Sequence, residues 1–107
     1  MTNAIELNDV NFEKEVKKSS VPVLVDFFAT WCNPCRQQMP IVEDLAKEFL
    51  GKVKIGKVNV DANAKTTSEF TISTIPTLLV FHEGRVVENL EGVSSKQQLT
   101  SILNKYL

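Results

Sequence analysis

The sequence has few of the residues from which stapled scaffolds and metal centres are built. Two of its 107 residues are cysteine and one is histidine. These three residues cannot supply the four cysteine or histidine ligands of a closed zinc site. Two cysteines also form at most one disulfide, so the chain is not a small scaffold held together by several disulfides.

The chain also has little net charge and few long apolar runs. The formal net charge is -1. The chain therefore has no excess of basic residues, which would favour binding to nucleic acid or to anionic membranes, so we expect neither as a partner. No segment is apolar over the length that a membrane span requires. The first residues also lack the basic and apolar regions of a secretory leader. We therefore expect a cytoplasmic protein.

The chain reads as one domain over residues 1–107, because no repeat, linker or low-complexity run interrupts it. Alternating apolar residues and continuous apolar runs predict strands. Apolar residues at helical spacing predict one helix after each of the first three strands and one after the last strand. The predicted strands are 4–7, 21–28, 53–60, 77–81 and 85–90. The order β-α-β-α-β-α-β-β-α predicts an α/β fold with a mixed sheet and helices on both faces.

Both cysteines lie in one motif, Trp31-Cys32-Asn33-Pro34-Cys35, directly after the predicted strand 21–28. If a helix begins there, its unpaired N–H groups favour a thiolate at the first cysteine. This spacing indicates a redox-active pair or part of a metal site. A structural disulfide would close too short a loop to stabilise much, and His82, interpreted as a surface residue, is the one further soft ligand for a metal. The redox interpretation is therefore favoured, with no metal.

Several separated segments resemble the thioredoxin family, and the likeness covers essentially the whole chain. They are residues 25–32, 57–61 and 75–77, together with the glycines at 84 and 92. The resemblance implies the thioredoxin fold, with a central mixed five-stranded sheet and helices on both faces. It also implies a protein disulfide reductase that acts by dithiol–disulfide exchange.

The resemblance also bears on cofactors and partners. It implies that no cofactor is bound, because the two thiols themselves hold the reducing equivalents. It implies a thioredoxin reductase as electron donor, with NADPH used only indirectly through that reductase, and oxidised proteins as clients. We expect the chain to act as a monomer.

Four residues are candidates for the exchange chemistry. Cys32 lies nearer the helix start and is the expected nucleophile, and Cys35 would then attack Cys32 to release the reduced client. The resemblance places Asp26 beneath the pair, where it would take a proton from Cys35 through water. The alternatives for Asp26 are a hydrogen-bonded core carboxylate and a residue at the edge of a strand. Lys57 would modulate the charge of Asp26, unless it is an ordinary surface lysine.

A second set of residues is expected to bind the client. The resemblance implies a cis Ile75–Pro76 bond beside the cysteines, although an isolated X–Pro bond favours trans. The backbone of Ile75 would then pair with an extended client segment. Trp31, unless it is an ordinary packed aromatic, would share an apolar surface with this loop. The candidate client-binding residues are Trp31, Asn33, Pro34, Thr74, Ile75, Pro76, Glu91 and Gly92.

The chain departs from the family pattern at the site itself. Asn33 replaces the usual glycine, and the other departures are Phe28, Thr74 and Glu91. The Asn33 carboxamide would either donate a hydrogen bond to the Cys32 thiolate or point into water. Two further functions thus stay open: a less reducing thiol oxidase or isomerase, and a binding module whose partner recognises one oxidation state.

Overall fold

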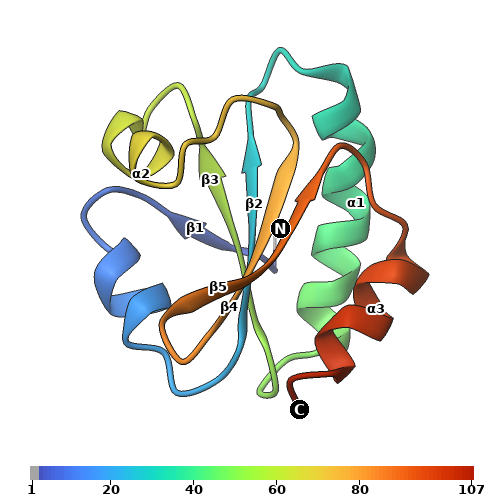
Figure 1. Cartoon of the computed structure of the whole chain (residues 1–107). Coiled ribbons are helices and arrows are strands. Elements are labelled where there is room, and N and C mark those ends of the chain that lie inside the picture. The colour runs from blue at the N-terminus through green and yellow to red at the C-terminus, as the bar shows by residue number, and fades with distance from the viewer. Residues whose placement is uncertain (1–2) are drawn as a thin grey trace.

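The computed structural model describes residues 3–107 and has the element order that the hydrophobic pattern predicts (Figure 1). The strands are β1 (Ile5–Leu7), β2 (Val23–Phe28), β3 (Lys54–Asn59), β4 (Thr77–His82) and β5 (Arg85–Glu91). The helices are η1 (Glu13–Lys17), α1 (Asn33–Glu48), α2 (Ala64–Glu69) and α3 (Lys96–Asn104). The α/β fold class is therefore confirmed.

The five strands form one mixed sheet in the order β1-β3-β2-β4-β5. Strands β1 and β2 both pair with β3 in parallel, and β4 pairs antiparallel with β2 and with β5. The central position of β2 explains its nearly continuous apolar sequence, since both of its faces are covered. Asp26 is the exception in β2, and it lies opposite Lys57 on β3 and Leu78 on β4.

Helices cover both faces of the sheet, as the sequence predicts. Figure 1 shows α1 and α3 together on one side and α2 with η1 on the other. Leu24 of β2 packs in the cluster formed with α1 and α3, whereas its neighbour Val25 packs in the cluster that contains Val16 of η1. Because side chains alternate along a strand, Asp26 points to the same face as Leu24, beneath α1.

The helix predicted after the first strand is the short segment η1. In η1 the Lys18 N–H donates to the Glu13 carbonyl, five residues back, so the turn is wider than an α-helical one. The Ser19 hydroxyl binds the backbone of Val21 as donor and acceptor. This local turn competes with a longer helix and leads the chain into β2.

Helix α1 begins at the cysteine motif. Cys32 is its N-cap, and Pro34 occupies the first turn, where a backbone N–H is not needed. The helix ends at Glu48, and Gly51 then turns the chain with a left-handed φ of 85°. The cysteine pair therefore lies at the junction between β2 and α1, as predicted.

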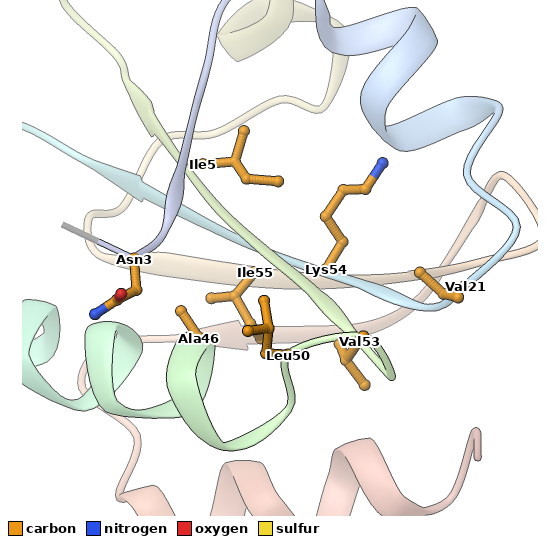
Figure 2. A pocket seen from close by; sticks show the side chains of 9 residues that line it. Asn3, Ile5, Val21, Ala46, Leu50, Val53, Lys54 and Ile55 are labelled. Carbon is orange, nitrogen blue, oxygen red and sulfur yellow. The ribbon is translucent and has the colours of Figure 1, made fainter.

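An apolar hollow of about 230 Å³ lies at the opposite end of the sheet from that junction. Figure 2 shows its lining, which comes from the start of β1, the end of α1 and the start of β3, with Ile5, Leu50 and Val53 among the side chains. The hollow is thus remote from the cysteines. Among the helices of residues 3–107, none combines the length and the apolar character needed to cross a membrane.

Candidate active site

Cys32 and Cys35 form a disulfide, with 5.2 Å between their Cα atoms. As the N-cap residue of α1, Cys32 has an extended backbone, and its sulfur accepts a hydrogen bond from the Cys35 N–H at 3.2 Å. The same N–H points at the sulfur that would carry negative charge after reduction. The local geometry therefore favours a thiolate at Cys32, since hydrogen bonds to a charged form stabilise that form.

The two sulfurs differ in their surroundings. Cys32 is 6% exposed and Cys35 is 2% exposed, and both lie with Ala29 in one small apolar cluster. The Cys32 sulfur lies 3.8 Å from the Ile75 carbonyl oxygen. Cys32 is thus the more accessible member of the pair, although both are largely buried.

Free volume flanks the disulfide on the Cys35 side. A hollow of about 240 Å³ lies there, and its lining is Phe28, Ala29, Thr30, Cys35, Arg36 and Met39. Phe28, one of the departures from the family pattern, forms part of this wall. The side chains around Cys35 are therefore mainly apolar, whereas the Cys32 sulfur has a backbone donor.

Asp26 is completely buried on β2. Neither of its carboxyl oxygens has a hydrogen-bond partner among residues 3–107, which excludes the alternative of a hydrogen-bonded core carboxylate within the described chain. Burial raises the pKa of Asp26 from 3.8 to about 7, and the positive charge of Lys57 opposes this rise. A carboxyl group with this pKa exchanges its proton near neutral pH, as a catalytic base must.

Lys57 is not a solvated surface lysine. Its side chain is 14% exposed, and its Nζ lies 3.2 Å from Oε2 of Glu43, whose side chain is 19% exposed. Glu43 also accepts hydrogen bonds from the N–H groups of Asn3 and Ala4. Burial raises the pKa of Glu43, but those two bonds and Lys57 outweigh it, so that the pKa lies below its usual value. Sequence reasoning missed Glu43, because nothing local marks it as the partner of Lys57.

Trp31 is exposed over 65% of its surface and is therefore not an ordinary packed aromatic. Its indole Nε1 donates to Oδ2 of Asp61 at 2.8 Å. This bond orients the ring beside the cysteine motif. Sequence reasoning placed Asp61 in a segment that resembles the family but assigned it no role.

The Ile75–Pro76 bond is cis, which is the isomer that the resemblance implies. The Pro76 carbonyl accepts a hydrogen bond from the Gly92 N–H at 2.9 Å, so the two loops lie together near the cysteines. Pro76 itself is buried, so it shapes the loop and adds no exposed apolar surface to it, in contrast to the expectation. Thr74 and Glu91 are exposed near the ends of β4 and β5.

Asn33 and Pro34 are exposed at the start of α1. The Asn33 Oδ1 accepts a hydrogen bond from Nη1 of Arg36 at 3.2 Å, and Arg36 also donates to the Thr30 carbonyl. In this oxidised form, no hydrogen bond joins Asn33 to Cys32 within the described chain. Arg36 is a further residue of the site that the spacing of the motif did not reveal.

The redox group of this site is the disulfide itself. Within residues 3–107, no three or more histidine, cysteine, aspartate or glutamate side chains gather in a way that could hold a metal ion. The arrangement provides a sulfur with a backbone donor, a second sulfur below it and a buried carboxyl group on the strand that leads to both. These are the groups that thiol–disulfide exchange requires.

Comparison with known proteins agrees with this chemistry. The family model described as Thioredoxin matches residues 3–105. The chain is 43% identical to the thioredoxin of Haemophilus influenzae and to thioredoxin 1 of a Nostoc species, in each case over 107 residues and all of both chains. It is 46% identical to the thioredoxin of Buchnera aphidicola over 105 residues, which cover 98% of this chain and 97% of that protein.

These relatives are similar over their full length, and the match includes the redox site. Thioredoxins carry no cofactor and use an active-site disulfide, which here joins Cys32 and Cys35. They are protein-disulfide oxidoreductases that act by dithiol–disulfide exchange, and this pair has the geometry for that reaction. The chain belongs to the thioredoxin family.

Proposed function

We propose that this protein reduces the disulfides of client proteins with Cys32 as the attacking thiolate and Cys35 as the resolving thiol. The observation that carries this assignment is the hydrogen bond from the Cys35 N–H to the Cys32 sulfur at the start of α1. That donor stabilises negative charge on the Cys32 sulfur, and Cys32 is also the more exposed residue of the two.

The reaction transfers two electrons from the dithiol to the client. The Cys32 thiolate attacks one sulfur of the client disulfide, and the other client sulfur leaves as a thiolate. Cys35 then loses its proton and attacks the Cys32 sulfur of the mixed disulfide. The bond between Cys32 and the client breaks, and the client leaves with two thiols. The Cys32–Cys35 disulfide remains on the protein.

Asp26 is proposed as the base that takes the Cys35 proton. It is buried on the face beneath α1, and its pKa of about 7 allows it to accept a proton near neutral pH. Lys57, its neighbour across β2 and β3, would stabilise the ionised carboxylate. Glu43 would hold Lys57 in place through their ion pair.

The proposed client-docking surface surrounds Cys32. Trp31 provides an exposed aromatic face, and the Ile75 backbone provides polar groups that an extended segment can pair with. Gly92 lies against the Pro76 loop through its N–H. Asn33, Pro34, Thr74 and Glu91 would contribute to the rim, because all four are exposed.

Family membership implies re-reduction by a thioredoxin reductase and contact with client proteins. We further propose that residues 1–107 form a single domain that acts as a monomer in the cytoplasm, without binding nucleic acid or membranes. The near-neutral charge of the chain supports the last two points. NADPH would enter only through the reductase.

Insulin reduction by dithiothreitol, with and without this protein, tests the proposed function. We expect the protein to accelerate the reaction, and the Cys32→Ser variant to be inactive. A protein that binds insulin without accelerating its reduction would instead be a redox-gated binding module. The redox potential of the Cys32–Cys35 pair then separates a reductase from a less reducing oxidase or isomerase, which Asn33 leaves open.

A further inference from the structure

A glutamine is completely buried in α1, one turn after the resolving cysteine. The side chain of Gln38 is 0% exposed. Its Nε2 donates to the Ser94 carbonyl at 3.0 Å, and its Oε1 accepts from the Ser94 N–H at 2.7 Å. Both main-chain polar groups of the buried Ser94 are therefore satisfied by one side chain that is 56 residues away in the sequence.

Ser94 ends the short loop that follows β5. Two residues earlier, the Gly92 N–H donates to the Pro76 carbonyl. Loop 92–94 is thus held at both ends, by Gln38 on one side and by the Pro76 loop on the other. Between these two attachments, Val93 is 46% exposed.

These attachments close a ring of contacts around the docking surface. One half of the ring is α1, which carries Cys32, Cys35 and Gln38. The other half leads from Ser94 and Gly92 to the Pro76 loop, where the Ile75 carbonyl lies 3.8 Å from the Cys32 sulfur. Gln38 is therefore one of the contacts that hold the loop near the reactive sulfur.

We propose that Gln38 is a positioning residue that fixes loop 92–94 against the redox helix and thereby determines how well protein clients dock. The proposal rests on the proposed function, because it names the side chain that holds part of the proposed docking surface. Gln38 hydrogen-bonds to Ser94 and not to either sulfur, so it acts on client binding and not on sulfur exchange itself.

The physical reason is the burial of the Ser94 groups. Without Gln38, one buried N–H and one buried carbonyl lose their partners, and leaving such groups unpaired is costly. The loop relieves this cost by moving so that water reaches Ser94. That movement displaces Val93 and Gly92 from the places where a client meets them.

The test compares a large and a small disulfide substrate. Gln38→Met keeps the length of the side chain and removes both hydrogen bonds, and Gln37→Met is the matched control because Gln37 is an exposed neighbour on the same helix. For Gln38→Met, we expect the KM for insulin to rise about tenfold, which corresponds to about 1.4 kcal/mol of binding free energy. We expect kcat for insulin and the rate with hydroxyethyl disulfide to stay within about twofold of the parent, and the control to match the parent.

A purely structural role would give a different result. Equal losses with insulin and hydroxyethyl disulfide, or an unchanged KM for insulin in a folded but less stable variant, would overturn the proposal.

A measurement on the parent protein covers the case in which the variants do not fold. Hydrogen exchange at the Ser94 amide should be strongly protected, whereas the amide of the exposed Val93 should exchange quickly. A Ser94 amide that exchanges as fast as that of Val93 would show that the loop is not held and would overturn the proposal. This readout does not depend on catalysis. A parent that protects the Ser94 amide but fails to reduce insulin would overturn the proposed function, and with it the docking role, while the attachment of loop 92–94 to Gln38 would stand.

Discussion

At the residue scale, the site places two chemically identical cysteines in different environments. Cys32 caps α1 and receives a backbone N–H, whereas Cys35 is the more buried and borders an apolar hollow. The first environment stabilises a thiolate that can attack a client. The second suits the resolving thiol that we propose, because burial shields Cys35 from outside disulfides.

Replacing one cysteine at a time with serine tests the proposed roles of the two cysteines. Cys35→Ser should accumulate a stable mixed disulfide with oxidised insulin through Cys32, because the resolving attack is lost. Cys32→Ser should accumulate little, since its remaining thiol is buried. Non-reducing electrophoresis followed by mass spectrometry measures both adducts. Comparable trapping by the two variants, or more by Cys32→Ser, would contradict the assignment of nucleophile and resolver.

The role of Asn33 can be tested by its effect on the redox potential of the Cys32–Cys35 pair. Its carboxamide oxygen accepts from Arg36 in the oxidised protein, so the amide nitrogen is the atom that could donate to a Cys32 thiolate after reduction. Such a bond would stabilise the reduced form. Asn33→Gly should then shift the potential in the reducing direction by roughly 10–30 mV, given that 30 mV is about 1.4 kcal/mol for two electrons.

Equilibration with glutathione measures this shift, and Gln37→Gly serves as a control at an exposed position of the same helix. An unchanged potential with altered turnover by the reductase would leave Asn33 as a recognition residue. A shift in the oxidising direction would refute the hydrogen bond.

At the scale of elements, the site depends on one strand and one helix that meet at the cysteines. Strand β2 carries Asp26 beneath α1, and α1 carries both Cys35 and Glu43. Glu43 ties α1 to β3 through Lys57 and to the chain before β1 through the N–H groups of Asn3 and Ala4. The charge near Asp26 thus depends on Lys57 of β3, on Glu43 of α1 and on the backbone before β1 that binds Glu43.

Removing the charge of Glu43 tests this link between elements. Glu43→Gln leaves Lys57 without its anionic partner, so the positive charge of Lys57 acts more fully on Asp26. Because Lys57 lowers the pKa of Asp26, we expect that pKa to fall below the parent value of about 7. Carbon-13 shifts of the Asp26 carboxyl group against pH, in the oxidised protein, measure it.

Glu48→Gln is the matched control, since Glu48 lies on the same helix and pairs with Lys96 instead. It should leave the titration of Asp26 unchanged. If Glu43→Gln also leaves it unchanged, the charge of Lys57 does not act on Asp26.

The elements could be predicted from the sequence because their signals are local. The apolar run of β2 and the cysteine motif at the start of α1 each specify a structure within a few residues. The partners at the site could not be predicted, since they are distant in the sequence. Gln38 reads as one more polar residue on a helix until its bonds with Ser94, 56 residues away, are seen. Asp61 and Glu43 were missed for the same reason.

Some features were predicted only through the likeness to a family. An isolated Ile-Pro pair favours a trans bond, and the buried carboxyl of Asp26 has no explanation in the pattern of β2 itself. The wide turn of η1 was not predicted either. The spacing of apolar residues does not distinguish a helix whose N–H groups bond to the carbonyl four residues back from one in which they bond to the carbonyl five residues back. Such features depend on what packs around the segment.

At the scale of the whole molecule, the buried carboxyl of Asp26 makes the stability of the fold depend on pH. The side chain is 0% exposed and lacks a hydrogen-bond partner within residues 3–107. Folding therefore disfavours its ionised form. This cost falls on the residue that we propose as the base of the reaction, on the face of β2 beneath α1.

Asp26→Ala should remove this pH dependence. The folded pKa of about 7 exceeds the ordinary value of 3.8, so between these pH values the folded state retains a proton that the unfolded state has lost. The free energy of unfolding of the parent should therefore fall as pH rises from about 4 to about 7, by about 4 kcal/mol in all at about 1.4 kcal/mol per unit of pKa difference. Asp26→Ala should follow a flatter profile, and its stability relative to the parent should rise over this range and level off above pH ~8.

Urea denaturation of the oxidised proteins at a series of pH values measures the effect, and the cysteines do not titrate in that form. The cavity left by alanine lowers stability by an amount that does not depend on pH, so the change between acid and alkaline pH is the informative quantity. Asp44→Ala, which removes an exposed carboxylate from α1, should parallel the parent. A variant of Asp26 that loses stability relative to the parent as pH rises would mean that the folded pKa is depressed, as in an ion pair with Lys57. Asp26 would then be a carboxylate throughout the neutral range and would be a poor acceptor for the Cys35 proton. The pH profile of stability therefore tests both the energetic cost of burying Asp26 and its proposed role as the base.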